Sequence, residues 1–264
     1  MIIFSFDSAV KNLGFCCISV NDTWQEETVA LIDELNAFYD SIPENRAQTI
    51  KQMRGLTKKA DTLINSVFEI KYMNIFDLIP GEQMSTKAYA NVVRRLKYLL
   101  FCLTQQLPKP DIVLIEYQMG ANDKSRGISR YIEEYFVGLN ADACNEITYS
   151  LPAYPLITAE VPDELCIGPE IISVNPNLKN AYQVDSSDAG SYTTFISKYT
   201  NYTANKKHTT WNFQYFLKTR GIEDKIEGAV GKLDDVSDAF MQAFAWCKSR
   251  KFILRDKKEK DTEK

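Results

Sequence analysis

Three aspartates lie close together at the start of a predicted apolar helix in the last part of the chain: Asp234, Asp235 and Asp238. Acids three or four positions apart share one helical face, with Cβ atoms roughly 5–6 Å apart, so two of these carboxylates can bind one cation. Both Asp235 with Asp238 and Asp234 with Asp238 fit this spacing. The structural alternative is that Asp234 caps the helix, while the other two favour the positive end of its dipole. The apolar residues that follow have the spacing of a helix packed on a core: Val236, Ala239, Phe240, Ala243, Phe244 and Trp246.

Two further acids come directly after predicted core strands. Asp7 follows the apolar residues 2–6, and Glu116 follows residues 112–115, which are apolar on both faces as in a central parallel strand. Burying a carboxylate there is costly unless something binds it. Open α/β sheets place their sites at the carboxyl ends of their strands. Asp7 could alternatively be a turn-forming Asp at a strand exit.

The residue types define the chemistry that such a site could do. The site would contain four carboxylates, from Asp7, Glu116, Asp238 and either Asp235 or Asp234, with no His and no Cys. Such a hard oxygen-ligand set suits Mg²⁺ or Mn²⁺ and does not suit zinc. Without metal, repulsion among these acids should raise some of their pKa values.

The remaining elements must bring these acids together. We predict strands over residues 2–6, 15–20, 72–79, 112–115 and 171–174, and helices over 87–106, 128–136, 206–220 and from 234 onward. A hairpin and a third strand, then alternating helices and parallel strands, predict an α/β chain with an RNase H-like fold. We therefore expect a mixed five-stranded sheet flanked by helices, with a helical insertion after the second strand.

One RNase H-like domain is expected over residues 1–250. The insertion is predicted over 22–70, a mobile loop over 180–205 and a charged tail over 251–264, disordered from Arg255. Between residues 140 and 169 the pattern favours loop, with at most a short strand over 147–149.

Composition excludes several classes of protein. The 264 residues are 45% hydrophobic and 25% charged, as in soluble globular proteins, and no apolar run approaches the roughly 20 residues of a membrane span. Met1 leads into a strand without a basic n-region, so no secretory signal and no membrane partner are expected. Six scattered cysteines and a single histidine, His208, favour reduced thiols in an intracellular compartment over a zinc site or disulfide framework.

The net charge of −4 does not favour nucleic acid, so positive charge would have to gather locally. Candidates for contacts with phosphates are Lys124, Arg126, Arg130 and Lys179, with Lys206 and Lys207. If these residues surround the carboxylates, they offset the negative charge of the site and bind without reading bases.

Several short motifs occur in a distinctive order. They are Phe6-Asp7 with Asn12 and Gly14, Ile115-Glu116-Tyr117-Gln118 with Asn122, the helix start Lys206-Lys207, and Asp235-x-x-Asp238-Ala239. This order resembles the RuvC-like Holliday junction resolvases, above all those of poxviruses and other large DNA viruses. The resemblance covers most of the chain outside residues 22–70 and 180–205. Ala9 departs from it, because the family usually has Gly two residues after the first Asp.

The resemblance implies a Mg²⁺-dependent endodeoxyribonuclease that cuts four-way DNA junctions formed in recombination or replication. Because a four-way junction offers two symmetry-related strands, we expect the active form to be a homodimer. The resemblance also implies two ions, Mg²⁺ or Mn²⁺, held by Asp7, Glu116, Asp235 and Asp238, with Lys206 or Lys207 at the scissile phosphate. The Tyr, Phe and Ile residues near 128–136 are candidates for the dimer interface. A viral protein of this kind would act at the replication site in the host cytoplasm or be carried in the virion.

Three alternatives remain open from the sequence. The chain could be another RNase H-like nuclease acting on RNA–DNA hybrids or flaps. It could be an actin-like phosphotransferase that binds ATP, although Ser8, Ala9 and Val10 lack the Gly-rich phosphate loop of that class. It could also be an inactive junction-binding scaffold, which the presence of all four acids disfavours.

Overall fold

The computed structural model of the chain describes residues 1–20, 30, 68–81, 85–118, 123–148, 168–184, 189–222 and 233–261. Most of the predicted helical insertion over residues 22–70 lies outside the described residues. Its last three residues belong to a strand, so the third strand begins earlier than the sequence predicted.

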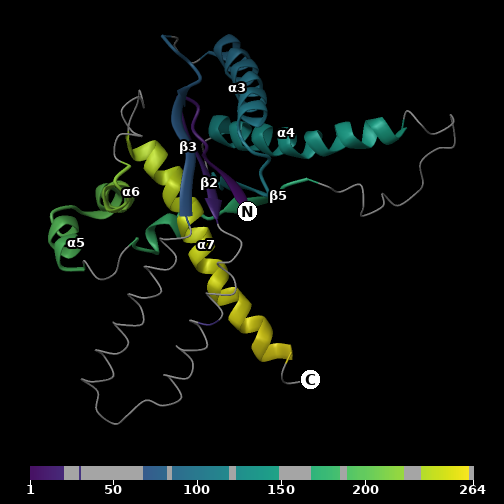
Figure 1. Ribbon diagram of the computed structural model, residues 1–264. Helices are drawn as coiled ribbons and strands as arrows, with labels where there is room; N and C mark the ends of the chain where they lie inside the picture. The colour runs from purple at the N-terminus through teal and green to yellow at the C-terminus, as the bar shows by residue number, and fades with distance from the viewer. Residues whose placement is uncertain are drawn as a thin grey trace.

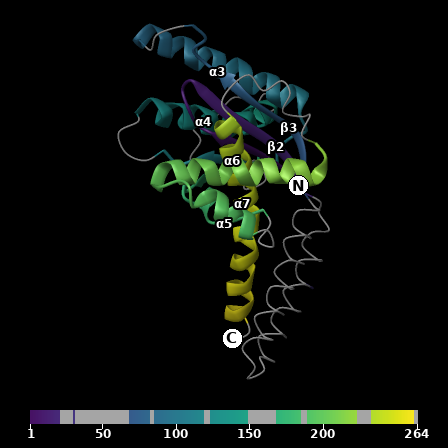
Figure 2. The ribbon, with the colours of Figure 1, turned by 90° about the vertical axis from the view of Figure 1, so that its left-hand side faces the viewer.

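A mixed sheet of five strands lies at the centre of the fold (Figures 1 and 2). The strands are β1 (Ile2–Asp7), β2 (Asn12–Val20), β3 (Phe68–Asp77), β4 (Ile112–Glu116) and β5 (Glu170–Val174). Their order in the sheet is β3-β2-β1-β4-β5. β1, β2 and β3 form an antiparallel meander, whereas β4 runs parallel to both β1 and β5. The predicted mixed five-stranded sheet is confirmed.

Helices flank the sheet on both faces. They are α3 (Thr86–Gln106), α4 (Asp123–Thr148), the 3₁₀ turn η2 (Leu178–Asn180), α5 (Ala189–Ile196), α6 (Asn201–Arg220) and α7 (Leu233–Asp261). The Ser85 hydroxyl caps α3 by accepting a hydrogen bond from Ala88 N. Gly221, with φ of 61°, ends α6 in the left-handed conformation that glycine adopts without strain. None of the helices in the described stretches is long and apolar enough to cross a membrane.

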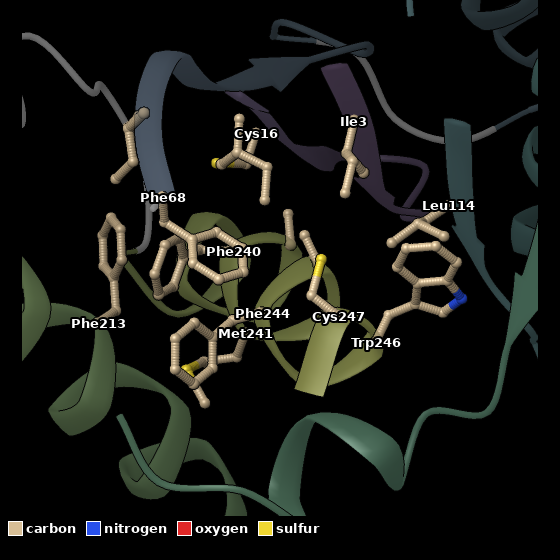
Figure 3. Close-up of a cluster of buried hydrophobic side chains, with 14 of the residues drawn as sticks. Ile3, Cys16, Phe68, Leu114, Phe213, Phe240, Met241, Phe244, Trp246 and Cys247 are labelled. Carbon is tan, nitrogen blue, oxygen red and sulfur yellow. The ribbon is translucent and has the colours of Figure 1, made fainter. Parts of the chain in front are cut away.

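Alternate residues of the central strands supply two separate cores, one on each face of the sheet. Ile3 on β1 packs with α6 and α7, as Figure 3 shows, whereas the next residue, Phe4, packs with α3 and α4. Successive side chains of a strand point to opposite faces, so both must be apolar when both faces are covered. This arrangement explains why the sequences of the central strands are continuous apolar runs.

The loop predicted over residues 180–205 is wrong for a large part of its length, because α5 and the first turn of α6 fall within it. Its Ser, Thr and Asn content favours turns, but Tyr192 of α5 packs edge-on against Trp211 of α6, with ring centroids 5.1 Å apart. Tertiary packing of this kind stabilises short helices that local propensity does not. Lys206 and Lys207 therefore lie in the second turn of α6 and do not start it.

Two further elements differ from the prediction. Residues 147 and 148 belong to α4 and not to a short strand. A helix satisfies its backbone hydrogen bonds internally, whereas a strand needs a neighbour to pair with. The charged tail predicted to be disordered from Arg255 is part of α7, which runs to Asp261. Lys, Glu and Arg have high helix propensity, so a charged composition does not by itself end a helix.

The N-terminal turn of α7 lies directly against the backbone of β2. Gly14 pairs with Asp7 across the first hairpin, and a Cβ atom at Gly14 would lie 2.2 Å from the carbonyl oxygen of Asp235. That distance is far below van der Waals contact, and the obstacle is backbone. Only glycine allows α7 to approach this closely.

We therefore predict that Gly14→Ala pushes the start of α7 away from the sheet. Overpacking of this kind costs about 1–3 kcal/mol of unfolding free energy, measurable by denaturant unfolding. The matched control is Gly138→Ala in α4, where a Cβ atom meets nothing within 4 Å. That change should be neutral or stabilise the protein, by up to about 1 kcal/mol, because alanine favours helix over glycine. Equal stability of both variants would contradict the close approach.

Candidate active site

The four acids singled out from the sequence line one pocket at the carboxyl end of the sheet. Asp7 ends β1, Glu116 ends β4, and Asp235 and Asp238 lie in the first two turns of α7. The pocket has a volume of about 360 Å³, large enough for a nucleotide unit. Its other lining residues are Ser8, Ala9, Gln118, Ser125, Pro176, Asn177, Lys179, Asn180, Asn205 and Lys206.

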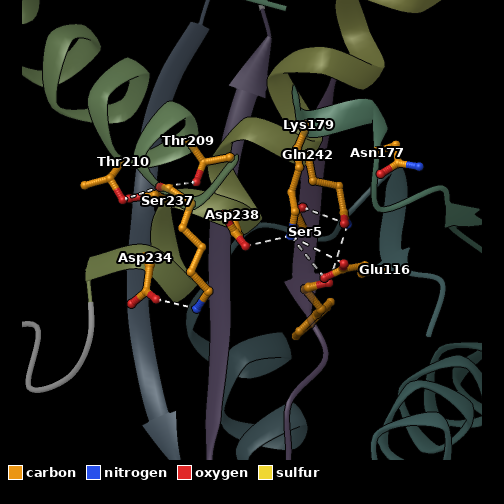
Figure 4. A network of polar contacts seen from close by, with 12 residues as sticks. Ser5, Glu116, Asn177, Lys179, Thr209, Thr210, Asp234, Ser237, Asp238 and Gln242 are labelled. Atoms are coloured by element: carbon orange, nitrogen blue, oxygen red, sulfur yellow. Dashed lines mark hydrogen bonds and ion pairs between the residues drawn. The ribbon is translucent and has the colours of Figure 1, made fainter. Parts of the chain in front are cut away.

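The sheet register explains why these acids meet. β1 and β4 are parallel neighbours with Phe6 opposite Ile115, so the next residues, Asp7 and Glu116, leave the sheet side by side. Gln242, one turn beyond Asp238, anchors α7 on β1: its Nε2 donates to Ser5 Oγ at 3.2 Å (Figure 4). Three elements far apart in the sequence therefore contribute acids to one site.

Lys179 occupies the centre of this acidic group. Its Nζ lies 2.6 Å from Asp238 Oδ2 and 3.4 Å from both carboxylate oxygens of Glu116 (Figure 4). The lysine side chain is 11% exposed. Burial alone would lower the pKa of Lys179, but the charges of Asp7, Asp238 and Glu116 outweigh burial and raise it. Lys179 therefore stays protonated and neutralises part of the site.

The ionisation of Asp7 is disfavoured by its surroundings. Burial raises its pKa well above the ordinary value, and a side-chain hydrogen bond to Glu116 and the charge of Glu116 raise it further, against the opposing effect of Lys179. The expected rise among crowded acids is present here, with burial as its largest cause. Asp7 can thus hold a proton and donate it in the hydrogen bond to Glu116.

The donor set fits a hard divalent cation. The side-chain atoms of the four acids that could ligate a cation are all carboxylate oxygens. One of them, Asp238 Oδ1, is buried and receives no hydrogen bond from any described residue. In the described part of the chain, however, no three or more acidic, His or Cys side chains surround a common point as a ready-made cage. The ammonium of Lys179 lies among the acids instead. Asp7, Glu116, Asp235 and Asp238 could hold Mg²⁺ or Mn²⁺ if Lys179 shares or yields its position.

Of the two lysines expected at the scissile phosphate, Lys206 lies at the pocket and Lys207 does not. Lys206 lines the pocket, but its Nζ is 2.7 Å from Asp234 Oδ2. Lys207 is exposed, does not line the pocket and lies over the ring of Tyr199, 5.7 Å from its centroid. The pairing with Lys206 takes Asp234 away from the pocket, so the acids that share it on α7 are Asp235 and Asp238.

The basic residues of α4 lie beside the pocket rather than in it. Lys124, Arg126 and Arg130 are exposed, and Arg126 forms an ion pair with Asp123. Their helix contributes Ser125 to the lining of the pocket, but none of these three cations lines it.

Lys179 was expected among the phosphate-binding residues, and the structure places it at the centre instead. The signal available in the sequence was its position just beyond β5, which pairs with β4 so that Val174 lies opposite Glu116. Sequence reasoning also missed Ser8, whose buried hydroxyl has no hydrogen-bond partner among the described residues.

An antiparallel meander followed by two parallel strands, with acids at the ends of β1 and β4 and on the last helix, defines an RNase H-like fold with an acidic site. No family model and no curated protein matches the chain.

Among solved structures, the chain is similar to the Fowlpox virus resolvase in complex with Holliday junction DNA. That similarity has a TM-score of 0.46 and 15% sequence identity, covering 94% of this chain and 98% of the other. A second structure of the Fowlpox virus Holliday junction resolvase gives a TM-score of 0.45 and 15% identity over 94% and 99% of the two chains. The structure of T. thermophilus RuvC in complex with a Holliday junction substrate gives a TM-score of 0.36 and 9% sequence identity. That similarity covers 93% of this chain and 92% of the other.

The crowding at Asp7 predicts that Asp7→Asn stabilises the metal-free protein. Because the raised pKa makes the charged form unfavourable, the native protein loses stability as pH rises through that pKa, and the neutral amide avoids this loss. We expect a gain of about 1 kcal/mol near neutral pH, typical for relieving a strained functional site, measured by unfolding in a chelator.

Asp111→Asn serves as the matched control for this measurement. Asp111 Oδ2 accepts a hydrogen bond from Ile2 N at 2.6 Å, so its carboxylate is stabilising and its loss should bring no gain. If Asp7→Asn is no more stable than Asp111→Asn, the electrostatic account of the pocket is wrong.

Proposed function

We propose that this protein is a metal-dependent endonuclease that resolves four-way DNA junctions by hydrolysing phosphodiester bonds. The observation that carries the proposal is the meeting of Asp7, Glu116, Asp235 and Asp238 in one pocket, with the ammonium of Lys179 between Glu116 and Asp238. A purely structural ion pair would not need four acids from three elements.

In such a reaction the four acids and Lys179 would have different roles. Divalent ions held by the four acids would supply an activated water molecule and positive charge beside the reacting phosphate. Lys179, which stays protonated, can donate hydrogen bonds to the phosphate oxygens and stabilise the negative charge that grows in the transition state. Glu116 and Asp238 keep the lysine in place until the phosphate enters.

Residues in and near the pocket offer contacts to the sugar–phosphate backbone. Lys124, Arg126 and Arg130 supply positive charge at one side, and Asn177 and Asn205 line the pocket with neutral amides. None of these side chains must reach a base edge, so binding should follow the shape of the nucleic acid and weaken steeply with salt.

A four-way junction is the proposed substrate because the order of the motifs resembles the junction resolvases. The pocket chemistry suits any phosphodiester, so RNA–DNA hybrids and flaps are the competing substrates. A junction presents two symmetry-related strands, and a homodimer would present two pockets to them.

The dimer interface proposed near residues 128–136 needs revision, because Ile128, Ile132 and Phe136 are fully buried in the core. Exposed apolar side chains on α3, Tyr98 and Phe101, are the better candidates. Sedimentation should show a dimer that Phe101→Lys weakens without loss of folding. A protein that is monomeric both free and on a junction would remove dimerisation from the proposal.

The central test is cleavage of a synthetic four-way junction beside linear duplex, flap and hybrid substrates, with an ATP hydrolysis control. Asp7→Asn and Glu116→Gln should each slow Mg²⁺-dependent cleavage by at least about 10²–10³-fold, the cost of removing one transition-state contact. Junction binding should persist. Asp234→Asn is the matched control on the same turn of α7, because its carboxylate is paired with Lys206. Cleavage that survives either pocket substitution would refute the assignment.

A separate prediction distinguishes the three lysines. In single-turnover reactions at saturating protein, Lys179→Ala should slow cleavage by about 10²-fold or more, because it removes a charge from the reacting centre. Lys206→Ala should have a smaller effect, and Lys207→Ala should leave the rate close to that of the unmodified protein. If Lys206→Ala or Lys207→Ala slows cleavage more than Lys179→Ala does, the lysine at the scissile phosphate is Lys206 or Lys207, as the sequence suggested.

A further inference from the structure

The segment that carries Lys179, residues 175–184, has little regular structure of its own. It joins β5 to the region before α5 and contains only the single 3₁₀ turn η2. Three of its residues, Asn177, Lys179 and Asn180, line the pocket. One short turn cannot hold a backbone in place, so the position of Lys179 depends on contacts from neighbouring elements.

Two buried side chains of α6 bind the backbone of this segment. His208 Nε2 lies 3.0 Å from the carbonyl oxygen of Tyr182, and Asn212 Oδ1 accepts a hydrogen bond from Val184 N at 2.8 Å. His208 is 6% exposed and Asn212 is fully buried. Groups this deeply buried are costly to leave unpaired, so these contacts define where the segment lies.

A third contact comes from α7. Lys248, 7% exposed, donates from Nζ to the carbonyl oxygen of Gln183 at 2.7 Å. Three successive residues, 182, 183 and 184, are therefore held by side chains of the two helices that pack on the sheet.

The hydrogen bonds define the tautomer of His208. A carbonyl oxygen only accepts, so Nε2 must carry the proton that it donates to Tyr182. Nδ1 then accepts from the hydroxyl of Tyr192 on α5, at 2.5 Å. Burial lowers the pKa of His208, although backbone hydrogen bonds to Tyr182 and to Lys179 itself act in the opposite direction. The neutral imidazole is thus oriented by Tyr182 at Nε2 and by Tyr192 at Nδ1.

We infer that His208 is a positioning residue of this nuclease: oriented by Tyr192, it holds the 175–184 segment so that the ammonium of Lys179 lies between Glu116 and Asp238. The inference rests on the proposed function. A long lysine side chain reaches its target only if its backbone is placed correctly, and misplacement by about 1 Å can cost about 10²-fold in rate.

A double-mutant cycle tests this inference. His208→Phe keeps the ring but removes both hydrogen bonds, and its effect is measured with Lys179 present and in the Lys179→Ala background. With Lys179 present, His208→Phe should lower the single-turnover cleavage rate at saturating protein by about tenfold or more. In the Lys179→Ala background it should lower the rate by less than about twofold, because the effects of two residues that act as one unit are not additive. Equal losses in both backgrounds would overturn the inference, because a general structural defect does not depend on Lys179.

Two other variants accompany the cycle. His208→Gln can still donate to the Tyr182 carbonyl, and it should retain more of the rate than His208→Phe. If Gln is as impaired as Phe, the hydrogen bond is not the cause. Thr209→Val is the matched control: Thr209 is equally buried on α6, but its hydroxyl donates to Lys206 O within the same helix. It should leave the rate unchanged in both backgrounds.

A readout without substrate separates this inference from the proposed function. Hydrogen exchange at the amides of residues 178–184 should become about tenfold faster in His208→Phe, as expected when buried contacts that prevent local opening are lost. Thr209→Val should not change it. If His208→Phe fails to fold, Tyr192→Phe, which removes only the orienting hydroxyl, replaces it in both measurements. Unchanged exchange would overturn the inference even in an active nuclease, whereas faster exchange in a protein that cleaves nothing would refute only the proposed function.

Discussion

The structure depends on how negative charge is neutralised at the carboxyl ends of the parallel strands β1 and β4. Asp7, Glu116 and Asp238 lie close together in partly buried positions, and unit charges 4 Å apart interact by about 4 kcal/mol at an effective dielectric constant of 20. Burial and the neighbouring acid raise the pKa of Asp7, and the ammonium of Lys179 offsets part of the repulsion. The arrangement suits a site that takes up positive charge, either from the protein itself or from a bound cation.

Rigid supports are needed to keep such a site from relaxing. The acids of β1 and β4 leave neighbouring strands that are buried on both faces, so neither can move without disturbing two cores. The acids of α7 are held by the close contact of that helix with Gly14 and by the hydrogen bonds of Gln242 to Ser5 and Phe6. The unfavourable proximity of the carboxylates is therefore maintained by apolar packing elsewhere in the molecule.

The cationic part of the site is built differently. Lys179 comes from a short segment outside the sheet, and its place is set by buried polar contacts from α6 and α7. Hydrogen bonds to backbone groups are directional, so they fix the position of this segment more closely than the packing of Leu178 and Val184 on the core alone would do. The single histidine of the chain, without an evident role in the sequence, belongs to this support.

Local sequence patterns determined the strands, the long helices and the four acids. Apolar runs at residues 2–6 and 112–115 indicate buried strands by themselves, and an acid that directly follows such a run is visible without knowing its neighbours. Only the tertiary structure decided which cation joins these acids and which aspartates of α7 face them. Lys179 enters the pocket because β5 lies beside β4. Asp234 is paired with Lys206 and does not line the pocket, whereas Asp235 and Asp238 do. These choices depend on distances between residues far apart in the chain, and local hydrophobicity and spacing carry no information about such distances. For the same reason α5 was not predicted, because the local helix propensity of its residues does not reveal that Tyr192 packs against Trp211 of α6.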